Sequence, residues 1–289
     1  MTPFLKLLRP HQWVKNAMVL TGLLFSHAWR EPAMVRSAAL ATLAFCLVSS
    51  FVYVMNDVAD RERDRLHPVK RGRPVASGAI GLNTAWILAL LAGALGAMCG
   101  YFASPQVLAI LCGYVVLNVG YSAGLKNIVL LDVFIIAAGF MLRVFAGTWA
   151  IGIPPSQWLI LCATMLALFF GFAKRRAELQ ADHRHDHNQR QVLSEYSTTM
   201  LDQFMTITGT GVVLTYALYT VSPSTIALHK TEHLIYTAPL VIYGVLRTIF
   251  LLQQRGEGEN PVRDFLLDSH VIVTFIAWVA FTAYLISGA

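Results

Sequence analysis

Residues 38–64 read AALATLAFCLVSSFVYVMNDVADRERD, and this stretch decides the fold class. Its first eighteen residues carry no charge, and a helix needs roughly 20 such residues to cross a bilayer. Asn56 and Asp57 end the apolar run, and two more carboxylates follow at Asp60 and Asp64. Charges at the mouth of a membrane helix are costly unless they have a function. The stretch therefore predicts a membrane helix that ends in a functional site.

Composition indicates an integral membrane protein. Of the 289 residues, 56% are hydrophobic and only 13% are charged, whereas about 25% of the residues in a soluble domain are charged. We therefore expect an all-α, polytopic membrane protein with nine transmembrane helices and, because no linker divides the chain, a single domain over residues 1–289. The expected spans are 14–30, 36–56, 82–102, 105–122, 128–150, 157–173, 199–221, 234–252 and 270–287.

The placement of lysine and arginine predicts the orientation. With the N-terminus in the cytoplasm, seventeen of the 22 Lys and Arg residues fall on cytoplasmic segments, three on the far side and two within spans. The positive-inside rule favours this topology in a cell membrane, and the longer polar loops place the expected active site on the cytoplasmic side. No basic stripe with interleaved aromatic residues is visible, so nucleic-acid binding is not expected.

We call the carboxylates of Asp57, Asp60 and Asp64 the acidic cluster. Their spacing of i, i+3 and i+7 puts them on one face of a continuous helix. Oxygen ligands of this kind suit Mg²⁺, which takes a few carboxylates and leaves positions for substrate phosphates. The alternative is a solvated helix end whose charges pair with one another. Lys70 and Arg73 favour phosphate binding beside such a metal, although positive-inside charge alone also explains them.

Other polar residues border or interrupt the apolar runs. Lys15 can bind a phosphate or reach the lipid headgroups. Arg143 lies well inside a span, where an arginine normally faces a polar cavity or a partner. Asp132 falls on the same helical face, so a structural pair of Asp132 with Arg143 is the alternative. Cations at 174–176 favour anion binding, but a stop-transfer cluster also explains them.

Two further patterns predict little. Histidines at 183, 185 and 187 look like a metal tract, but alternation of this kind in a hydrophilic loop is more typical of a solvated segment. All four cysteines lie within apolar spans and show no metal-ligand spacing, so a disulfide framework is not expected.

The motif Asn56-Asp57-x-x-Asp60-x-x-x-Asp64 at the end of a span resembles that of the UbiA superfamily of intramembrane prenyltransferases. This resemblance implies a helical bundle around a central cavity that opens to the cytoplasm and laterally to lipid. Typical quinone-pathway members carry a second aspartate-rich motif at the end of the sixth span. This chain has Lys-Arg-Arg-Ala-Glu there, at 174–178. An acidic and a basic cluster are therefore expected to line one pocket.

Within that superfamily, the chain resembles the decaprenyl-phosphate phosphoribosyltransferase branch over nearly its whole length. The likeness is carried by residues 9–16, 56–74, 121–126, 139–143 and 174–178. It implies an enzyme that transfers 5-phosphoribose from phosphoribosyl pyrophosphate to a polyprenyl phosphate of decaprenyl type. Pyrophosphate is released and Mg²⁺ is the implied cofactor. Synthesis of an arabinan precursor of the cell wall is the implied pathway, and a different polymer or glycolipid is the alternative.

The same resemblance implies roles for individual residues. Asp57, Asp60 and Asp64 are expected to bind the metal and, with Lys126, to be catalytic. The expected substrate-binding residues are Lys15, Asn56, Lys70, Arg73, Tyr121, Asp132, Arg143, Lys174 and Arg175. Because the acceptor phosphate is already an anion, catalysis is expected to need alignment and charge neutralisation without a protein nucleophile.

Other functions remain open at this level. One is UbiA-type transfer of a prenyl group from a prenyl diphosphate to an aromatic acceptor, which the missing second aspartate motif disfavours. A transporter is disfavoured by an odd number of spans without a clear inverted repeat. A lipid-binding scaffold would leave the aligned carboxylates unexplained. The oligomeric state is also open, and a homo-oligomer is one of the alternatives.

Overall fold

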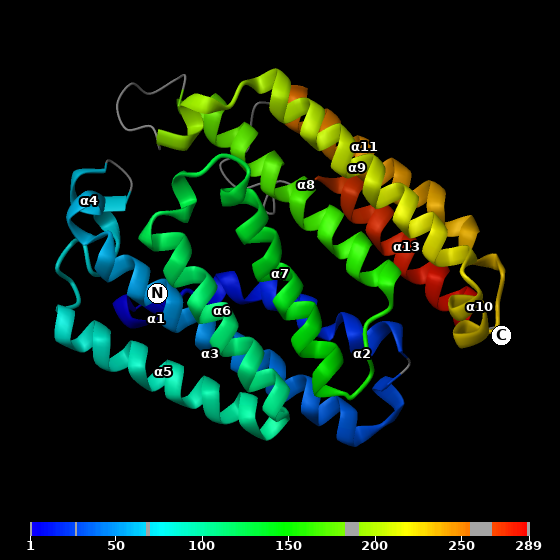
Figure 1. Ribbon diagram of the computed structural model, residues 1–289, viewed down its shortest axis with the longest axis horizontal. Coiled ribbons are helices and arrows are strands. Elements are labelled where there is room, and N and C mark those ends of the chain that lie inside the picture. Colours follow the sequence, from blue (N-terminus) through cyan, green and yellow to red (C-terminus); the bar gives the residue numbers. More distant parts are fainter. Residues whose placement is uncertain (1, 27, 68–69, 183–190, 255–267, 288–289) are drawn as a thin grey trace. The chain divides into compact units, whose positions relative to one another are not determined.

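The computed structural model describes residues 2–26, 28–67, 70–182, 191–254 and 268–287, and all regular structure among them is helical (Figure 1). Eight helical segments of these described residues are long and apolar enough to cross a membrane, which confirms the expected all-α, multi-pass architecture. The histidines at 183, 185 and 187 lie outside the described residues. The long helices are α3 (Pro32–Ala59), α5 (Leu82–Ala103), α6 (Pro105–Ala123), α7 (Leu131–Ala150), α8 (Gln157–Asp182), α9 (Thr198–Val221), α11 (Ala238–Gln254) and α13 (Ser269–Ser287).

Short helices connect the long ones. They are α1 (Pro3–Leu8), η1 (Pro10–Leu20), α2 (Thr21–Phe25), η2 (Ala28–Arg30), α4 (Arg61–Leu66), η3 (Lys70–Gly72), η4 (Leu125–Asn127), η5 (Gln191–Glu195), α10 (Pro223–His229) and η6 (His233–Thr237), where η denotes a 3₁₀ helix. Local side chains fix where two long helices begin. Ser197 accepts a hydrogen bond from the backbone N–H of Met200 at the start of α9, and Asp268 accepts one from Val271 at the start of α13, each at 3.1 Å.

The first expected span, 14–30, is not one continuous helix. It is divided among η1, α2 and η2, so eight of the nine expected spans have a long helix in the described residues. Asn16 gives the physical reason for the difference. Its buried amide donates to the hydroxyl of Ser49 and the sulfur of Cys46, both on α3. The hydrogen-bonding groups of this polar side chain of η1 therefore find their partners within the protein. Contacts of this kind override the apolar pattern on which the expectation rested.

The chain divides into two compact units. Unit 1 comprises Met1–Ala123 and Met141–Pro155, and unit 2 comprises Gly124–Phe140 and Ser156–Ala289. Helix α7 contributes its first half to unit 2 and its second half to unit 1. The expectation of a single domain stays a prediction.

Unit 1 is built around α3, which packs against α5, α6 and η1. Its main apolar core joins these helices to the second half of α7 through buried side chains such as Phe45, Val52 and Leu111. Gly147 of α7 brings this helix into very close approach with η1. A Cβ atom at Gly147 would lie 1.7 Å from the carbonyl oxygen of Val19, so the packing needs a glycine at this position.

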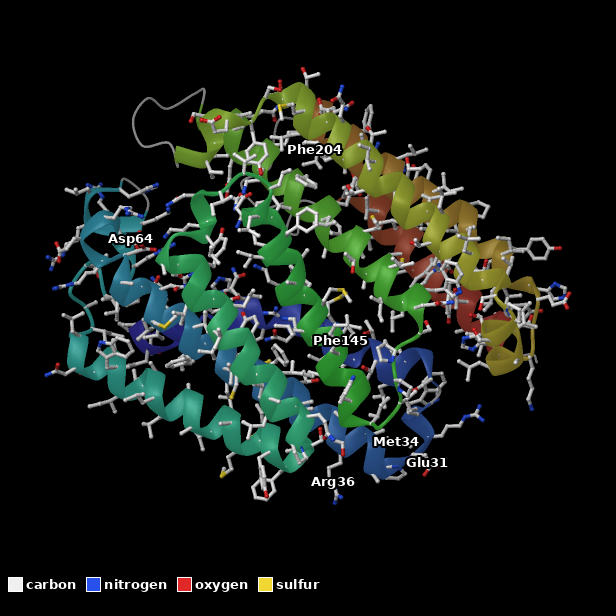
Figure 2. The ribbon with its side chains drawn as sticks, in the orientation of Figure 1. Glu31, Met34, Arg36, Asp64, Phe145 and Phe204 are labelled. Atoms are coloured by element: carbon white, nitrogen blue, oxygen red, sulfur yellow. The ribbon has the colours of Figure 1, made fainter. Side chains whose placement is uncertain are left out.

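Unit 2 is a set of helices in which α8 packs against α9, and α11 packs against α9 and α13. Its core gathers buried residues of α7, α8 and α9, among them Val133, Phe169 and Met205. Phe204 of α9 packs on Phe172 of α8 with their ring centroids 5.1 Å apart (Figure 2). This core holds the C-terminal end of α8, where the cations at 174–176 lie.

We predict that Gly147→Ala lowers the thermal stability of the protein, because the added methyl group meets backbone atoms of Val19 that cannot rotate away. Overpacking of this kind costs about 1–3 kcal/mol or more. Thermal unfolding in detergent measures the effect. Gly113→Ala on α6 is the matched control, since nothing lies within 4 Å of its Cβ position. Equal melting temperatures for the two variants would contradict the assigned packing of η1.

Candidate functional site

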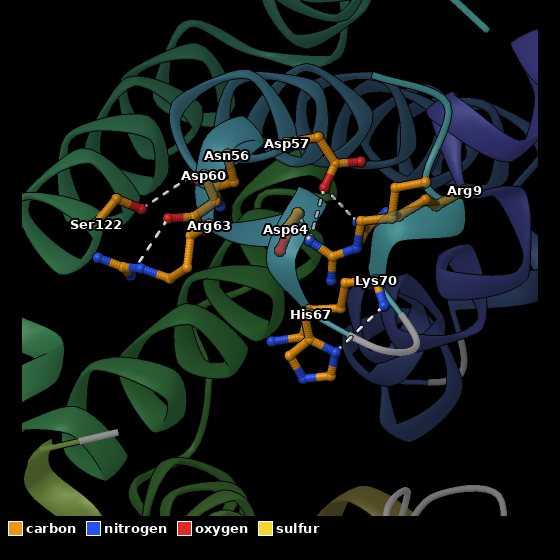
Figure 3. A network of polar contacts seen from close by, with 10 residues as sticks. Arg9, Asn56, Asp57, Asp60, Arg63, Asp64, His67, Lys70 and Ser122 are labelled. Atoms are coloured by element: carbon orange, nitrogen blue, oxygen red, sulfur yellow. Dashed lines mark hydrogen bonds and ion pairs between the residues drawn. The ribbon is translucent and has the colours of Figure 1, made fainter. Parts of the chain in front are cut away.

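The acidic cluster lies where α3 ends and α4 begins, in unit 1 (Figure 3). The expectation of one continuous helical face is wrong, because the helix breaks at Asp60, which has φ −89° and ψ 5°. Asp57 and Asp64 are buried, with 2% and 3% of their surfaces exposed. The carboxylate of Asp60 is more exposed and lies 3.6 Å from the guanidinium of Arg63. The break therefore separates an inner pair of carboxylates from an outer one.

Two guanidinium groups bind the inner carboxylates. Arg9 Nη2 lies 2.5 Å from Asp57 Oδ1. Arg73 Nη1 lies 3.1 Å from the same oxygen and 2.6 Å from Asp64 Oδ2, so Arg73 bridges the two acids. Two negative charges thus face two positive charges, which offsets part of the desolvation cost of the buried carboxylates.

Arg9 was not among the predicted binding residues. It stands between α1 and η1 with φ +53°, in the left-handed region that is uncommon for a residue with a side chain. Its guanidinium lies over the ring of Tyr53 on α3, 5.5 Å from the ring centroid. The only sequence signal was its place in the segment 9–16 that carries the family resemblance, and this segment did not identify Asp57 as its partner.

Arg73 is placed by the loop that follows α4. Val75 and Ile80 are buried in a small apolar cluster with Leu7 of α1 and Val54 of α3. Arg65 of α4 donates to the carbonyl of Ala76 at 3.1 Å, which holds the same loop to the helix. The loop therefore fixes the backbone beside Arg73, while the guanidinium itself stays partly exposed.

Other predicted residues of unit 1 lie on the elements around the acidic cluster. Asn56 accepts a hydrogen bond from Ser122 Oγ at 2.8 Å, which ties the end of α3 to the end of α6, next to Tyr121. Lys70 lies in η3, where its backbone N–H donates to His67 Nδ1 at 3.3 Å. Lys15 of η1 and Tyr121 are half-buried and have contacts of their own.

The cluster can be tested for its fit to a divalent cation. Among the described residues, no three His, Cys, Asp or Glu side chains are gathered as a ready-made metal site. However, Asp57 Oδ2 is buried and has no hydrogen-bond partner, although a buried carboxylate oxygen normally has one. An uncompensated oxygen beside a second buried carboxylate is a donor set that a hard cation such as Mg²⁺ prefers. The residues present therefore fit the metal.

Arg143 is buried in unit 1, in the second half of α7. Its Nε donates to Asn16 Oδ1 at 2.7 Å and its Nη2 to the hydroxyl of Tyr114 at 3.1 Å. Its guanidinium also lies over the rings of Phe45 and Tyr114. These contacts join α7 to η1, α3 and α6, so Arg143 has a clear role in packing as well as its predicted role in binding.

The cationic triplet consists of Lys174, Arg175 and Arg176, in unit 2. Arg175 is fully buried, with its Nε 2.6 Å from Asp132 Oδ2 of α7, and it also pairs with Glu178. The guanidinium of Arg175 is therefore bound to carboxylates of α7 and α8.

Arg176 is also buried and directed into the protein. It pairs with Asp202 of α9 and donates to the carbonyl of Leu252 at the end of α11 at 2.6 Å. Lys174 is the partly open member, with 44% of its side chain exposed and its Nζ 3.7 Å from Glu178 Oε1. Lys174 is thus the member of the triplet that a dissolved anion can reach.

Tyr196 completes the surroundings of Asp132. Its hydroxyl donates to Asp132 Oδ1 at 2.9 Å and accepts from the backbone N–H of Leu130 at 2.7 Å. Leu130 has φ +67°, a strained value for a residue with a side chain, and this hydrogen bond compensates it. Burial, together with the Asp132 carboxylate, raises the pKa of Tyr196 to about 12, so the hydroxyl keeps its proton. Lys126 is half-buried on η4, which packs against η5 just before Tyr196.

Comparison with known proteins identifies the family. A sequence model of the UbiA prenyltransferase family matches residues 17–269. Decaprenyl-phosphate phosphoribosyltransferase of Corynebacterium glutamicum is 35% identical over 95% of this chain and 84% of its own. The protein of the same name in Mycolicibacterium smegmatis is 28% identical over 95% of this chain and 89% of its own. The solved UbiA homolog from Archaeoglobus fulgidus bound to GPP and Mg²⁺ shares the fold, with a TM-score of 0.73, 21% identity and coverage of 99% and 98%. The chain belongs to the UbiA prenyltransferase family.

Proposed function

We propose that the protein transfers 5-phosphoribose from phosphoribosyl pyrophosphate to a polyprenyl phosphate of decaprenyl type, and that it does so on the cytoplasmic side of the cell membrane. The observation that carries this proposal is the chemistry of two helix ends. The end of α3 has buried carboxylates that fit Mg²⁺, whereas the end of α8 has cations. The relatives from Corynebacterium and Mycolicibacterium, matched over most of their length, bear the name of this activity.

The pyrophosphate end of the donor is assigned to unit 1. Asp57, Asp60 and Asp64 are the residues that would hold Mg²⁺, which when bound would neutralise charge on the leaving pyrophosphate. Asn56 orients this site through its hydrogen bond with Ser122. Cationic contacts to the phosphates are assigned to three further residues of the same unit, Lys15, Lys70 and Arg73.

The reaction needs no protein nucleophile. The bond between ribose C1 and the pyrophosphate oxygen breaks, and its electron pair leaves with pyrophosphate while C1 gains oxocarbenium character. A phosphate oxygen of the lipid then forms the new bond to C1. This oxygen is already an anion, so no proton has to be removed, and catalysis rests on alignment and on neutralising the leaving group.

The remaining phosphate, that of the ribose or of the lipid, is assigned to Lys126 and Lys174 of unit 2. Lys174 is the exposed member of the triplet, which supports a direct contact. Asp132 and Arg175 support the site by holding α7 and α8 together. Tyr121 and Arg143, also predicted to bind substrate, remain assigned to the lining of the site in unit 1.

One assay separates this activity from UbiA-type prenyl transfer. Purified protein is incubated with Mg²⁺, ribose-labelled phosphoribosyl pyrophosphate and a polyprenyl phosphate, and label is measured in the organic phase. Label in the organic phase supports the proposal. Transfer only from a prenyl diphosphate to an aromatic acid would replace it with the alternative.

We predict that Asp57→Asn reduces this transfer on the order of 10²–10³-fold, as loss of a group that stabilises developing charge commonly does. The amide keeps the shape of the side chain but removes the negative charge that pairs with Arg9 and Arg73, so the melting temperature in detergent should also fall, and turnover is compared below the melting temperature of the variant. Near-normal turnover in a folded variant would remove Asp57 from the metal site.

We predict that two neighbouring substitutions on α8 change different properties, one the binding of substrate and the other the stability of the fold. Lys174→Ala should weaken donor binding about tenfold or more, since a hydrogen bond to a charged group contributes about 1.5–3 kcal/mol, and should leave the melting temperature unchanged. Arg175→Ala should lower the melting temperature, because loss of one partner of a buried pair costs about 3–5 kcal/mol. Lys6→Ala, an exposed residue of α1, is the charge control. Unchanged affinity of the Lys174 variant for both phosphoribosyl pyrophosphate and the polyprenyl phosphate would favour a purely topological role.

A further inference from the structure

Arg9 and Arg73 occupy the carboxylates that are assigned to the metal. Arg9 binds Asp57 Oδ1, and Arg73 binds both that oxygen and Asp64 Oδ2 (Figure 3). The other oxygen of Asp57 has no hydrogen-bond partner. A dication that binds this oxygen therefore lies close to two guanidinium charges, and the Coulomb repulsion between them acts in a buried setting where solvent screens it weakly.

These two arginines differ from Arg175 in one decisive respect. Arg175 is fully buried, so no dissolved anion can reach it. The side chains of Arg9 and Arg73 are 22% and 30% exposed, while their partner carboxylates are buried. An anion that arrives from water can therefore bind either guanidinium without any need to unfold the site.

Phosphate groups are strong competitors for such guanidiniums, because the planar fork of arginine matches two phosphate oxygens at once. A diphosphate that binds Arg9 and Arg73 draws them away from Asp57 and Asp64. The freed carboxylates then face the metal with their full charge. The diphosphate thus removes the guanidiniums that compete with the metal, and the metal removes the carboxylates that compete with the diphosphate.

Resting on the proposed function of the acidic cluster, we infer that Arg9 and Arg73 are exchangeable counter-ions that make metal and diphosphate bind as a pair. Mg²⁺ alone binds weakly because the guanidiniums hold its ligands. The diphosphate alone binds weakly because the carboxylates hold its cations. Binding of either one raises the affinity for the other by the same factor, as thermodynamic linkage requires. Arg9, which has no role in the proposed function above, would thus couple the binding of metal and diphosphate.

The test measures binding, not turnover. Mn²⁺ serves as a spectroscopic substitute for Mg²⁺, and its affinity for the purified protein is titrated by electron paramagnetic resonance in the absence of phosphate. Inorganic pyrophosphate affinity is measured by calorimetry at saturating Mg²⁺ and again without metal, after correction for the formation of the metal–pyrophosphate complex in solution. The ratio of the two pyrophosphate affinities gives the coupling factor.

For the wild type we expect a coupling factor on the order of tenfold or more. Arg9→Gln should raise the affinity for Mn²⁺ alone and lower the affinity for Mg²⁺-pyrophosphate, each by about fivefold or more, so the coupling falls. Arg71→Gln removes the same charge at an exposed position of η3 and should leave both affinities within about twofold. A residue that only supported the fold would weaken both affinities together.

Arg9→Lys and Arg73→Gln guard against a variant that does not fold. The lysine keeps the charge and should retain part of the coupling, and Arg73→Gln should shift the two affinities in the same opposite directions as Arg9→Gln. Tight binding of Mn²⁺ alone to the wild type, or a lower Mn²⁺ affinity in both folded glutamine variants, overturns the inference. A wild type with the expected coupling that transfers no phosphoribose to lipid would instead refute the proposed function and leave the coupling intact.

Discussion

Neutralisation of buried charge is the constraint on which the polar architecture of this chain depends. Only 13% of the residues are charged, and several of those charges lie inside an apolar helical structure. A lone buried charge is expensive, so most of these charges meet an opposite charge, while Arg143 is held by hydrogen bonds to Asn16 and Tyr114 and by aromatic rings. Such pairs join separate elements of the chain: Arg9 with Asp57, Arg73 with Asp64, Arg175 with Asp132, Arg176 with Asp202, and Arg247 with Asp268. The same contacts that hold the helices therefore also build the candidate site.

The sequence could predict the long helices because their signal is local. An apolar run of about 20 residues has few alternatives to a membrane helix, and in the part of the chain that the structure describes eight of the nine expected spans have such a helix. The prediction of one helix over residues 14–30 was wrong because the structure of this segment depends on tertiary contacts. Asn16 is satisfied by α3, and Gly147 lets α7 approach η1 closely. Neither contact can be read from the apolar pattern of residues 14–30.

Prediction of the site had the same limit. Residue type and spacing identified the acidic cluster, and the structure places Arg73 against two of its members. The sequence could not separate an arginine that is open to a ligand from one that is committed to a buried partner. Arg175 looked equivalent to Lys174, yet one is fully buried and the other is half exposed. Arg9 was missed because its partner lies 48 residues away in the chain.

Under the proposed function, charge assigns different phosphate groups to the two helix ends. Arg175 and Arg176 are neutralised by their own carboxylates, so the triplet offers a dissolved anion mainly the single charge of Lys174. One ammonium is a reasonable match for a monophosphate and a poor one for a diphosphate, which carries more charge. At the end of α3, the guanidiniums of Arg9 and Arg73 can act together with a dication held by the carboxylates, and this combination matches the larger charge. The proposed reaction involves a diphosphate on the donor and monophosphates on the donor and the lipid, so it calls for both kinds of site. Transfer of a prenyl group to an aromatic acceptor would require neither Lys174 nor the buried Arg175 and Arg176.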